Sequence, residues 1–145
     1  MKLRNRFGGF TLIEMLVVLV IIGLLAGLVG PKLFTKVDSS KVQTAQTPVK
    51  MLKGALEAMR LDIGTFPTTE QGLALLTEQP KDEKLRAKWH GSYLEDALPN
   101  DPWGNPYQYS VPGSNGQPFA LYSFGADGKK GGEGNDADIG MLPPE

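Results

Sequence analysis

Acidic residues and glycines gather in one stretch near the C-terminus, residues 125–140, with the sequence GADGKKGGEGNDADIG. Its 16 residues include six glycines, three aspartates, one glutamate and one asparagine. Carboxylates and free backbone carbonyls on a tightly curving chain suit Ca²⁺, which takes about six to eight oxygen ligands in tolerant geometry. The spacing differs from that of an EF-hand, so this class of calcium site is excluded. The alternative is a solvated acidic loop that binds no metal.

Glu14 is a second residue with distinctive chemistry, because it is the only charged residue between Phe10 and Gly30. As a helix, these 21 residues would span about 31 Å, the thickness of a bilayer's hydrocarbon core. A carboxylate there costs about 2.5 to 3.5 kcal/mol near the centre, so it usually has a partner. If the chain is cut after Gly9, the new amine of Phe10 lies four residues away on the same helical face. The alternative is a boundary Glu that extends to the lipid headgroups or favours the helix N-terminus.

The residues before this segment predict its orientation in a membrane. Residues 1–9 carry three basic residues and no acid, and this bias keeps the N-terminus in the cytoplasm. The chain after Pro31 is therefore expected outside the cytoplasm. Gly8–Gly9 form a flexible junction that a protease could bind in extended form.

Composition excludes several functional classes. The formal net charge is −1, and removal of residues 1–9 would leave 12 basic against 16 acidic residues, so a general attraction to nucleic acid is not expected. The sequence has no cysteine, which excludes a disulfide framework and a cysteine-based zinc site. His90 is the only histidine, and the sequence contains no HExxH motif, no phosphate-binding loop and no recognisable Ser/His/Asp set. An enzyme is therefore not expected.

Hydrophobic periodicity predicts a long helix. From Val37 to roughly Leu61, apolar residues recur at steps of three or four after the first, which indicates an amphipathic helix whose stripe packs a domain core. Four weak helix formers at residues 23–31 should bend or open the helix upstream. Pro48 should kink it, or else Thr47 caps a new helix with Pro48 in its first position.

Shorter elements are expected further along the chain. Thr68-x-x-Gln71 is a capping box that predicts a short helix to about Glu78. Residues 79–98 are expected to form a connecting loop with hydrophobic contacts. Turn and alternation signals predict short strands. These strands are expected at residues 107–111, at residues 119–124, and near Ile139 or before Pro99.

Three motifs together resemble one family. The stretch GG-FTLIEMLVVLVIIGLLAGLVGP is similar to the class III signal of type IV pilins and type II secretion pseudopilins. The stretches FPTTEQGLALL and LPNDPWGNPYQY resemble the major pseudopilins of type II secretion. The resemblance implies an α+β, type IV pilin-like fold, with a long N-terminal helix packed on a short second helix and a small antiparallel sheet of about three strands. It also implies three regions: a prepilin leader (1–9), a transmembrane and filament-core helix (10–31), and an extracytoplasmic globular domain (32–145).

The same resemblance implies roles for particular residues. A prepilin peptidase would cut after Gly9 and methylate the amine of Phe10. Glu14 would help subunits join a filament by pairing with a neighbouring subunit's N-terminus. SFGADG and NDADIG match the two halves of a C-terminal calcium loop, which implies Ca²⁺ as a cofactor. The implied calcium ligands are the carboxylates of Asp127, Asp136 and Asp138 and the backbone carbonyls of Phe124 and Lys129.

The function implied by the resemblance is structural. The subunit would polymerise into the periplasmic filament of a type II secretion system, with minor pseudopilins and an inner-membrane secretion platform, and would drive export of folded proteins. Before assembly it would cross the inner membrane once, with the globular domain in the periplasm. The alternatives are a type IV pilus subunit for adhesion, motility or DNA uptake, and a membrane-anchored metal-dependent binding module. The missing cysteine pair and basic patch argue against the pilus subunit.

Overall fold

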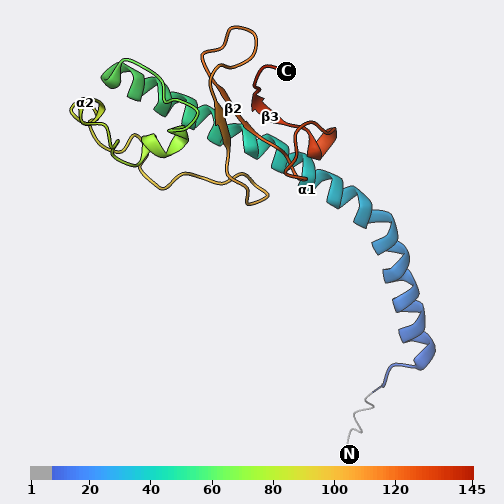
Figure 1. The fold of residues 1–145 in the computed structure, drawn as a ribbon. Coiled ribbons are helices and arrows are strands. Elements are labelled where there is room, and N and C mark those ends of the chain that lie inside the picture. The colour runs from blue at the N-terminus through green and yellow to red at the C-terminus, as the bar shows by residue number, and fades with distance from the viewer. Residues whose placement is uncertain (1–7) are drawn as a thin grey trace, which may run out of the picture. The chain divides into compact units, whose positions relative to one another are not determined.

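The structure is a computed structural model of the 145-residue chain, and it describes residues 8–145 (Figure 1). Most of the predicted leader, residues 1–7, lies outside the described residues. The chain divides into two compact units, the first ending at Val37 and the second running from Asp38 to Glu145. Helix α1 (Leu12–Ile63) contributes residues to both units.

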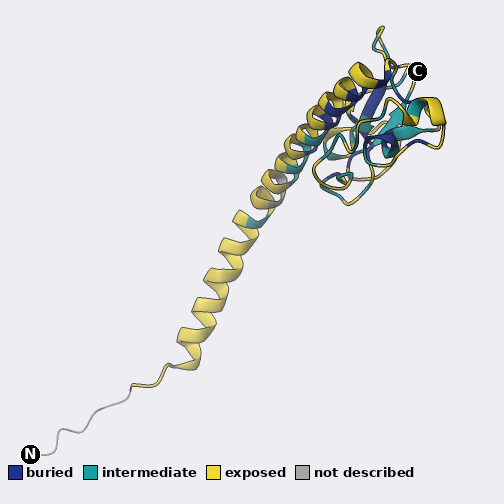
Figure 2. Cartoon of the chain, turned by 90° about the vertical axis from the view of Figure 1, so that its left-hand side faces the viewer, coloured by how far each residue is buried: buried dark blue, intermediate teal, exposed yellow. Residues whose placement is uncertain are grey.

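In the first unit, the apolar residues of α1 from Leu12 to Leu33 are exposed, and Figure 2 shows this part of the helix in yellow. Leu12 is 92% exposed and Leu19 is 69% exposed. An 18-residue window of this helix has a mean hydropathy of 2.9, and none of its residues is buried. By length and composition, the helix could therefore cross a membrane. The helix continues through Gly23 and Pro31, so the predicted opening there is not seen. Pro31 removes only one hydrogen bond of the helical ladder, and the other bonds can hold the turn.

In the second unit, α1 carries the predicted apolar stripe, and Figure 2 shows its buried residues on the side that faces the sheet. The helix runs through Pro48 without a break, so Thr47 does not begin a separate helix, and it ends at Ile63, two residues beyond the predicted end. The buried members of the stripe are Ala45, Val49, Leu52, Leu56, Met59 and Ile63.

The predicted capping box is present after α1. The Thr68 amide donates to Gln71 Oε1 (2.9 Å), and the Gln71 amide donates to Thr68 Oγ1 (3.3 Å). The element that follows is a 3₁₀ helix, η1 (Gly72–Leu76), shorter than the predicted helix to Glu78. Its buried leucines at 73, 75 and 76 face the core. The pattern therefore predicted which residues are buried but not the type or length of the helix.

The predicted loop at residues 79–98 contains one helical turn, α2 (Glu83–Arg86), which was not expected. Asp82 caps it by accepting hydrogen bonds from the amides of Lys84 (2.8 Å) and Leu85 (3.1 Å). The predicted hydrophobic contacts of this segment are present. The side chains of this segment that pack against the core are Leu85, Trp89, Tyr93, Leu94 and Leu98.

Three short antiparallel strands form a sheet in the order β1-β2-β3. The strands are β1 (Gln108–Ser110), β2 (Ala120–Ser123) and β3 (Ile139–Met141). Tyr109 pairs with Leu121, and Tyr122 pairs with Gly140. The first two strands are shorter than predicted, and the third lies at the predicted position near Ile139. The α+β class with about three antiparallel strands is confirmed.

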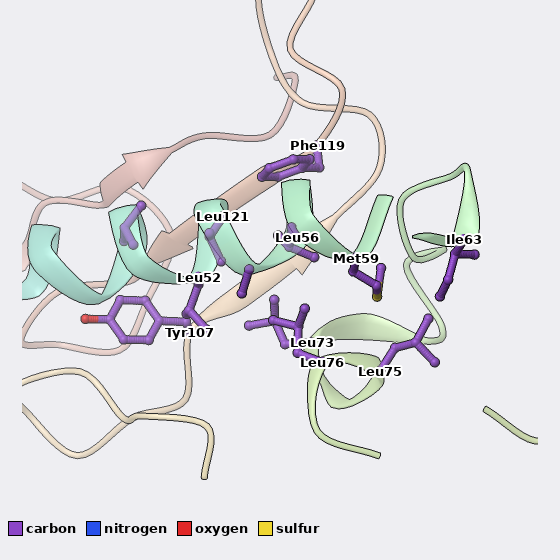
Figure 3. Packing of buried hydrophobic residues seen from close by; sticks show 12 residues of the cluster. Leu52, Leu56, Met59, Ile63, Leu73, Leu75, Leu76, Tyr107, Phe119 and Leu121 are labelled. Carbon is purple, nitrogen blue, oxygen red and sulfur yellow. The ribbon is translucent and has the colours of Figure 1, made fainter. Parts of the chain in front are cut away.

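The helices and the sheet share one hydrophobic core, in which side chains from α1, η1 and the β2 region gather (Figure 3). The rings of Phe66 and Phe119 meet edge to face with centroids 4.8 Å apart. The Tyr107 hydroxyl donates to the Ala45 carbonyl (2.9 Å), which ties the start of β1 to α1. This core fixes the position of β2, and β2 leads directly into the predicted calcium loop.

Candidate functional site

A reciprocal set of hydrogen bonds begins α1 at the predicted assembly residue. Glu14 Oε2 accepts from the Thr11 amide (2.8 Å) and from the Thr11 hydroxyl (3.0 Å). The Glu14 amide donates back to Thr11 Oγ1 (3.3 Å). This is a capping box, T-x-x-E, which satisfies amides that a helix N-terminus otherwise leaves unpaired. Gly8, Gly9 and Phe10 precede it without regular structure and are exposed.

The capping box gives Glu14 a partner that the sequence interpretation missed. The carboxylate is engaged by Thr11, three residues away, whereas the predicted partner was the amine of Phe10 in the cut chain. The motif T-x-x-E was readable in the sequence, since Ser or Thr followed three residues later by Glu is a helix-start signal. The structure thus agrees with the alternative in which Glu14 favours the helix N-terminus. Pairing with a neighbouring subunit stays a prediction.

The predicted calcium loop connects β2 to β3 and is closed by its own backbone. The Ala126 amide donates to the Asn135 carbonyl (2.8 Å). A short 3₁₀ helix, η2 (Gly134–Asp136), ends the loop before β3. The chain on either side of the long acidic stretch is therefore held together, as a curved binding loop requires.

Two glycines make this closure possible. Gly125 has a φ of +73°, and a Cβ there would lie 2.7 Å from the Ala137 carbonyl oxygen. Gly132 has a φ of +86°, and a Cβ there would collide with the Asp136 carbonyl oxygen. Both backbone conformations favour glycine, so any other residue would force the loop open.

The predicted carboxylate ligands contact the loop backbone. Asp127 Oδ1 accepts from the Lys129 amide (3.0 Å), and Asp138 Oδ2 accepts from the Gly131 amide (3.0 Å). Asp136 is exposed at the end of η2. Within residues 8–145, no three Asp, Glu, His or Cys side chains gather closely enough to hold a metal ion. The structure therefore brings the predicted ligands into one closed loop but does not arrange them as a cluster of carboxylates.

One atom of the loop fits a cation. Asp138 Oδ1 is buried and has no hydrogen-bond partner among residues 8–145. Burial raises the pKa of the neighbouring Tyr122 phenol, and the Asp138 carboxylate raises it further. An unpaired buried carboxylate oxygen is costly unless something positive satisfies it. The predicted ligands of the loop are all oxygens, which suits Ca²⁺ rather than a metal that prefers nitrogen or sulfur.

A buried polar network lies beside the loop and was not predicted from the sequence. Asp101 Oδ1 accepts from the amides of Trp103 (3.0 Å) and Asn105 (2.8 Å), and Asp101 Oδ2 accepts from the Ser123 hydroxyl (2.6 Å). The Gly125 amide then donates to Ser123 Oγ (3.1 Å). The turn residues were recognisable, since Asp often bonds the amide two residues on. The link to Ser123, 22 residues away, depends on the tertiary fold.

Comparison with known proteins identifies the family. A family model described as "Type II secretion system (T2SS), protein G" matches residues 32–142. The chain belongs to this protein G family. A second model, described as "Prokaryotic N-terminal methylation motif", matches residues 4–30, which include Gly9, Phe10 and Glu14.

Individual relatives support the assignment of the chain to the protein G family. The chain is 48% identical over 137 residues to type II secretion system core protein G of Pseudomonas aeruginosa, with 94% of this chain and 96% of the relative covered. It is 44% identical over 140 residues to the core protein G of Vibrio cholerae, covering 97% and 94% respectively. It also resembles the crystal structure of the major pseudopilin from enterohaemorrhagic Escherichia coli, with a TM-score of 0.59 and 32% identity over 75% of this chain and 92% of that chain.

Family membership decides between the three functional classes that the sequence left open: a type II secretion pseudopilin, a type IV pilus subunit and a membrane-anchored binding module. The chain is a structural subunit of the type II secretion pseudopilin class and not an enzyme. The predicted methylation motif at the N-terminus and the predicted pilin-like fold are confirmed.

Proposed function

We propose that this pseudopilin is cut after Gly9, methylated at Phe10, and assembled into a periplasmic helical filament that drives export of folded proteins across the outer membrane. Its partners would be further copies of itself, minor pseudopilins, an inner-membrane secretion platform and a prepilin peptidase. Before assembly the subunit crosses the inner membrane once, with the N-terminus in the cytoplasm. The family match supports the filament role, and the match of residues 4–30 supports the processing step.

The observation that carries this proposal is the exposed apolar surface of α1 in the first unit. Its side chains are exposed all round the helix, from Leu12 to Leu33. Such a surface must be covered by lipid or by other apolar helices. A filament core built from copies of the same helix covers it after the subunit leaves the membrane. The single carboxylate in this stretch lies at the helix start, where a neighbour's new amino group could reach it.

Calcium is the second part of the proposal. Asp127, Asp136 and Asp138 would supply carboxylate oxygens, and Phe124 and Lys129 would supply backbone carbonyls. When bound, the ion would neutralise negative charge on the acidic side chains of the loop. The loop residues themselves supply the oxygens, and Gly125 and Gly132 allow the chain to curve. The buried, unpaired Asp138 Oδ1 supports this assignment.

Intact-mass measurement tests the processing step. Protein purified from a host that has a prepilin peptidase should lack residues 1–9 and carry one added methyl group on Phe10. Gly9→Val is expected to leave the chain uncut, because a β-branched side chain replaces glycine directly before the scissile bond. Gly8→Val is the matched control, and it should still be processed, since Gly8 does not form part of the scissile bond between Gly9 and Phe10. Full-length wild-type chains in this host would refute the proposed processing.

A further inference from the structure

Two buried polar residues join the second unit's core to the start of the acidic loop. Asp101 is 5% exposed and Ser123 is fully buried. Asp101 lies in the turn before β1, and Ser123 is the last residue of β2. Buried polar side chains are costly unless their hydrogen bonds are made. The hydrogen bonds of Asp101 and Ser123 therefore indicate what these two residues contribute to the fold.

The hydrogen bonds form a chain in which each donor points from the loop towards the turn: the Gly125 amide donates to Ser123, and Ser123 donates to Asp101. Asp101 holds the turn through two amides on Oδ1 and accepts the Ser123 hydroxyl on Oδ2 at 2.6 Å. This distance is typical of a hydroxyl bound to an ionised carboxylate, which is the stronger class of hydrogen bond. With its proton committed to Asp101, the Ser123 oxygen presents lone pairs to its other neighbour. That neighbour is the Gly125 amide, at 3.1 Å.

The Gly125 amide belongs to the same peptide group as the Phe124 carbonyl. A trans peptide is planar, and its N–H and C=O point in opposite directions. Fixing the Gly125 N–H on Ser123 therefore turns the Phe124 carbonyl away from Ser123. Without the bond to Ser123, the plane of this peptide group could reorient, because Gly125 accepts a wide range of backbone angles.

We infer that Asp101 and Ser123 are positioning residues for the acidic loop. They lock the Phe124–Gly125 peptide group so that the Phe124 carbonyl is presented to a bound cation. The inference rests on the calcium part of the proposed function, but the locking of the peptide group does not. Partners of this kind, which orient a metal ligand without touching the metal, typically contribute about 10- to 100-fold to metal affinity.

Two measurements on the full chain in detergent micelles test this inference. The first is Ca²⁺ affinity by isothermal titration calorimetry, with calcium chloride as the titrant. The second is the hydrogen-exchange rate of the Gly125 amide, measured by NMR on calcium-free protein. Ser123→Ala should weaken Ca²⁺ binding by about 10- to 100-fold and speed the exchange of Gly125 by roughly tenfold, the effect of one lost hydrogen bond.

Two further variants separate positioning from general destabilisation. Asp101→Asn keeps the side-chain shape and an oxygen for the turn amides, but it replaces Oδ2, which accepts the Ser123 hydroxyl, with an NH₂ group that can only donate. It should weaken Ca²⁺ binding in the same direction. Ser92→Ala is the matched control, since Ser92 Oγ also bonds the backbone, at Leu94 (2.6 Å), but lies away from the loop in sequence. Its Ca²⁺ affinity and Gly125 exchange should match the wild type.

The outcomes distinguish this inference from the proposed function. If the wild type binds Ca²⁺ and both Ser123→Ala and Asp101→Asn bind it equally tightly, the inference is wrong and the calcium proposal stands. If the wild type binds no Ca²⁺, the calcium proposal fails and the inferred presentation of the carbonyl fails with it. An unchanged Gly125 exchange rate in calcium-free Ser123→Ala overturns the locking of the peptide group in either case.

Discussion

Glu14→Ala is expected to reduce incorporation of the subunit into filaments to background, while cleavage after Gly9 continues. A charge buried among apolar helices needs one fixed partner, so the Glu14 carboxylate would set the register between neighbouring subunits. Alanine removes that charge and leaves the apolar surface of the helix intact. The measurement is the share of subunit recovered in sheared, sedimented filaments, compared with the total processed subunit.

The capping box supplies a sharper control for this experiment. Glu14→Gln keeps an oxygen that can accept from Thr11, because glutamine also serves in a capping box. It removes only the charge. If Glu14 acts by pairing with a neighbour's amine, Glu14→Gln should fail to assemble as Glu14→Ala does. Assembly of Glu14→Ala at wild-type levels would refute the role in register, and assembly of Glu14→Gln alone would assign Glu14 to helix capping.

Removal of calcium is expected to destabilise the second unit. A ligand at about 100 times its Kd stabilises the folded state by about 2.7 kcal/mol. For a unit of this size, each kcal/mol shifts the melting temperature by roughly 4 to 8 °C. A chelator should therefore lower the melting temperature by several degrees or more, as followed by circular dichroism on the full chain in detergent micelles.

Substitutions in the loop should mimic the chelator. Asp127→Ala removes one predicted carboxylate ligand and should lower the melting temperature in calcium, with little further effect of chelator. Asp96→Ala is the matched control, because Asp96 is exposed and lies outside the loop. A melting temperature that neither the chelator nor Asp127→Ala changes would rule out calcium stabilisation.

Periodic patterns predicted the scaffold because they depend on neighbours close in sequence. The stripe from Ala45 to Ile63 is buried as the period of an α-helix requires. The third strand near Ile139 and the turn-linked strands before it were likewise readable from local signals. The one-turn helix α2 was missed because Glu83–Arg86 is too short to show a period, and charged residues surround its Asp82 cap.

The candidate site was less predictable, because its contacts join distant segments. The bond between Asp101 and Ser123 crosses 22 positions and needs β2 to be placed beside the turn. The acids of the loop were visible in the sequence, but no local rule states which oxygen is left unpaired, as Asp138 Oδ1 is. The capping box of Thr11 and Glu14 differs from these contacts, because its T-x-x-E signal is local and could be read in the sequence.

The most direct test of the filament role is export of a folded protein by the host. In a strain that lacks this chain, we predict that secreted enzymes accumulate in the periplasm and that wild-type protein restores their appearance in the medium. The measurement is enzyme activity in the medium and periplasm, with a cytoplasmic enzyme as the control for lysis. Undiminished export in the deletion strain would contradict a role of this subunit in driving secretion.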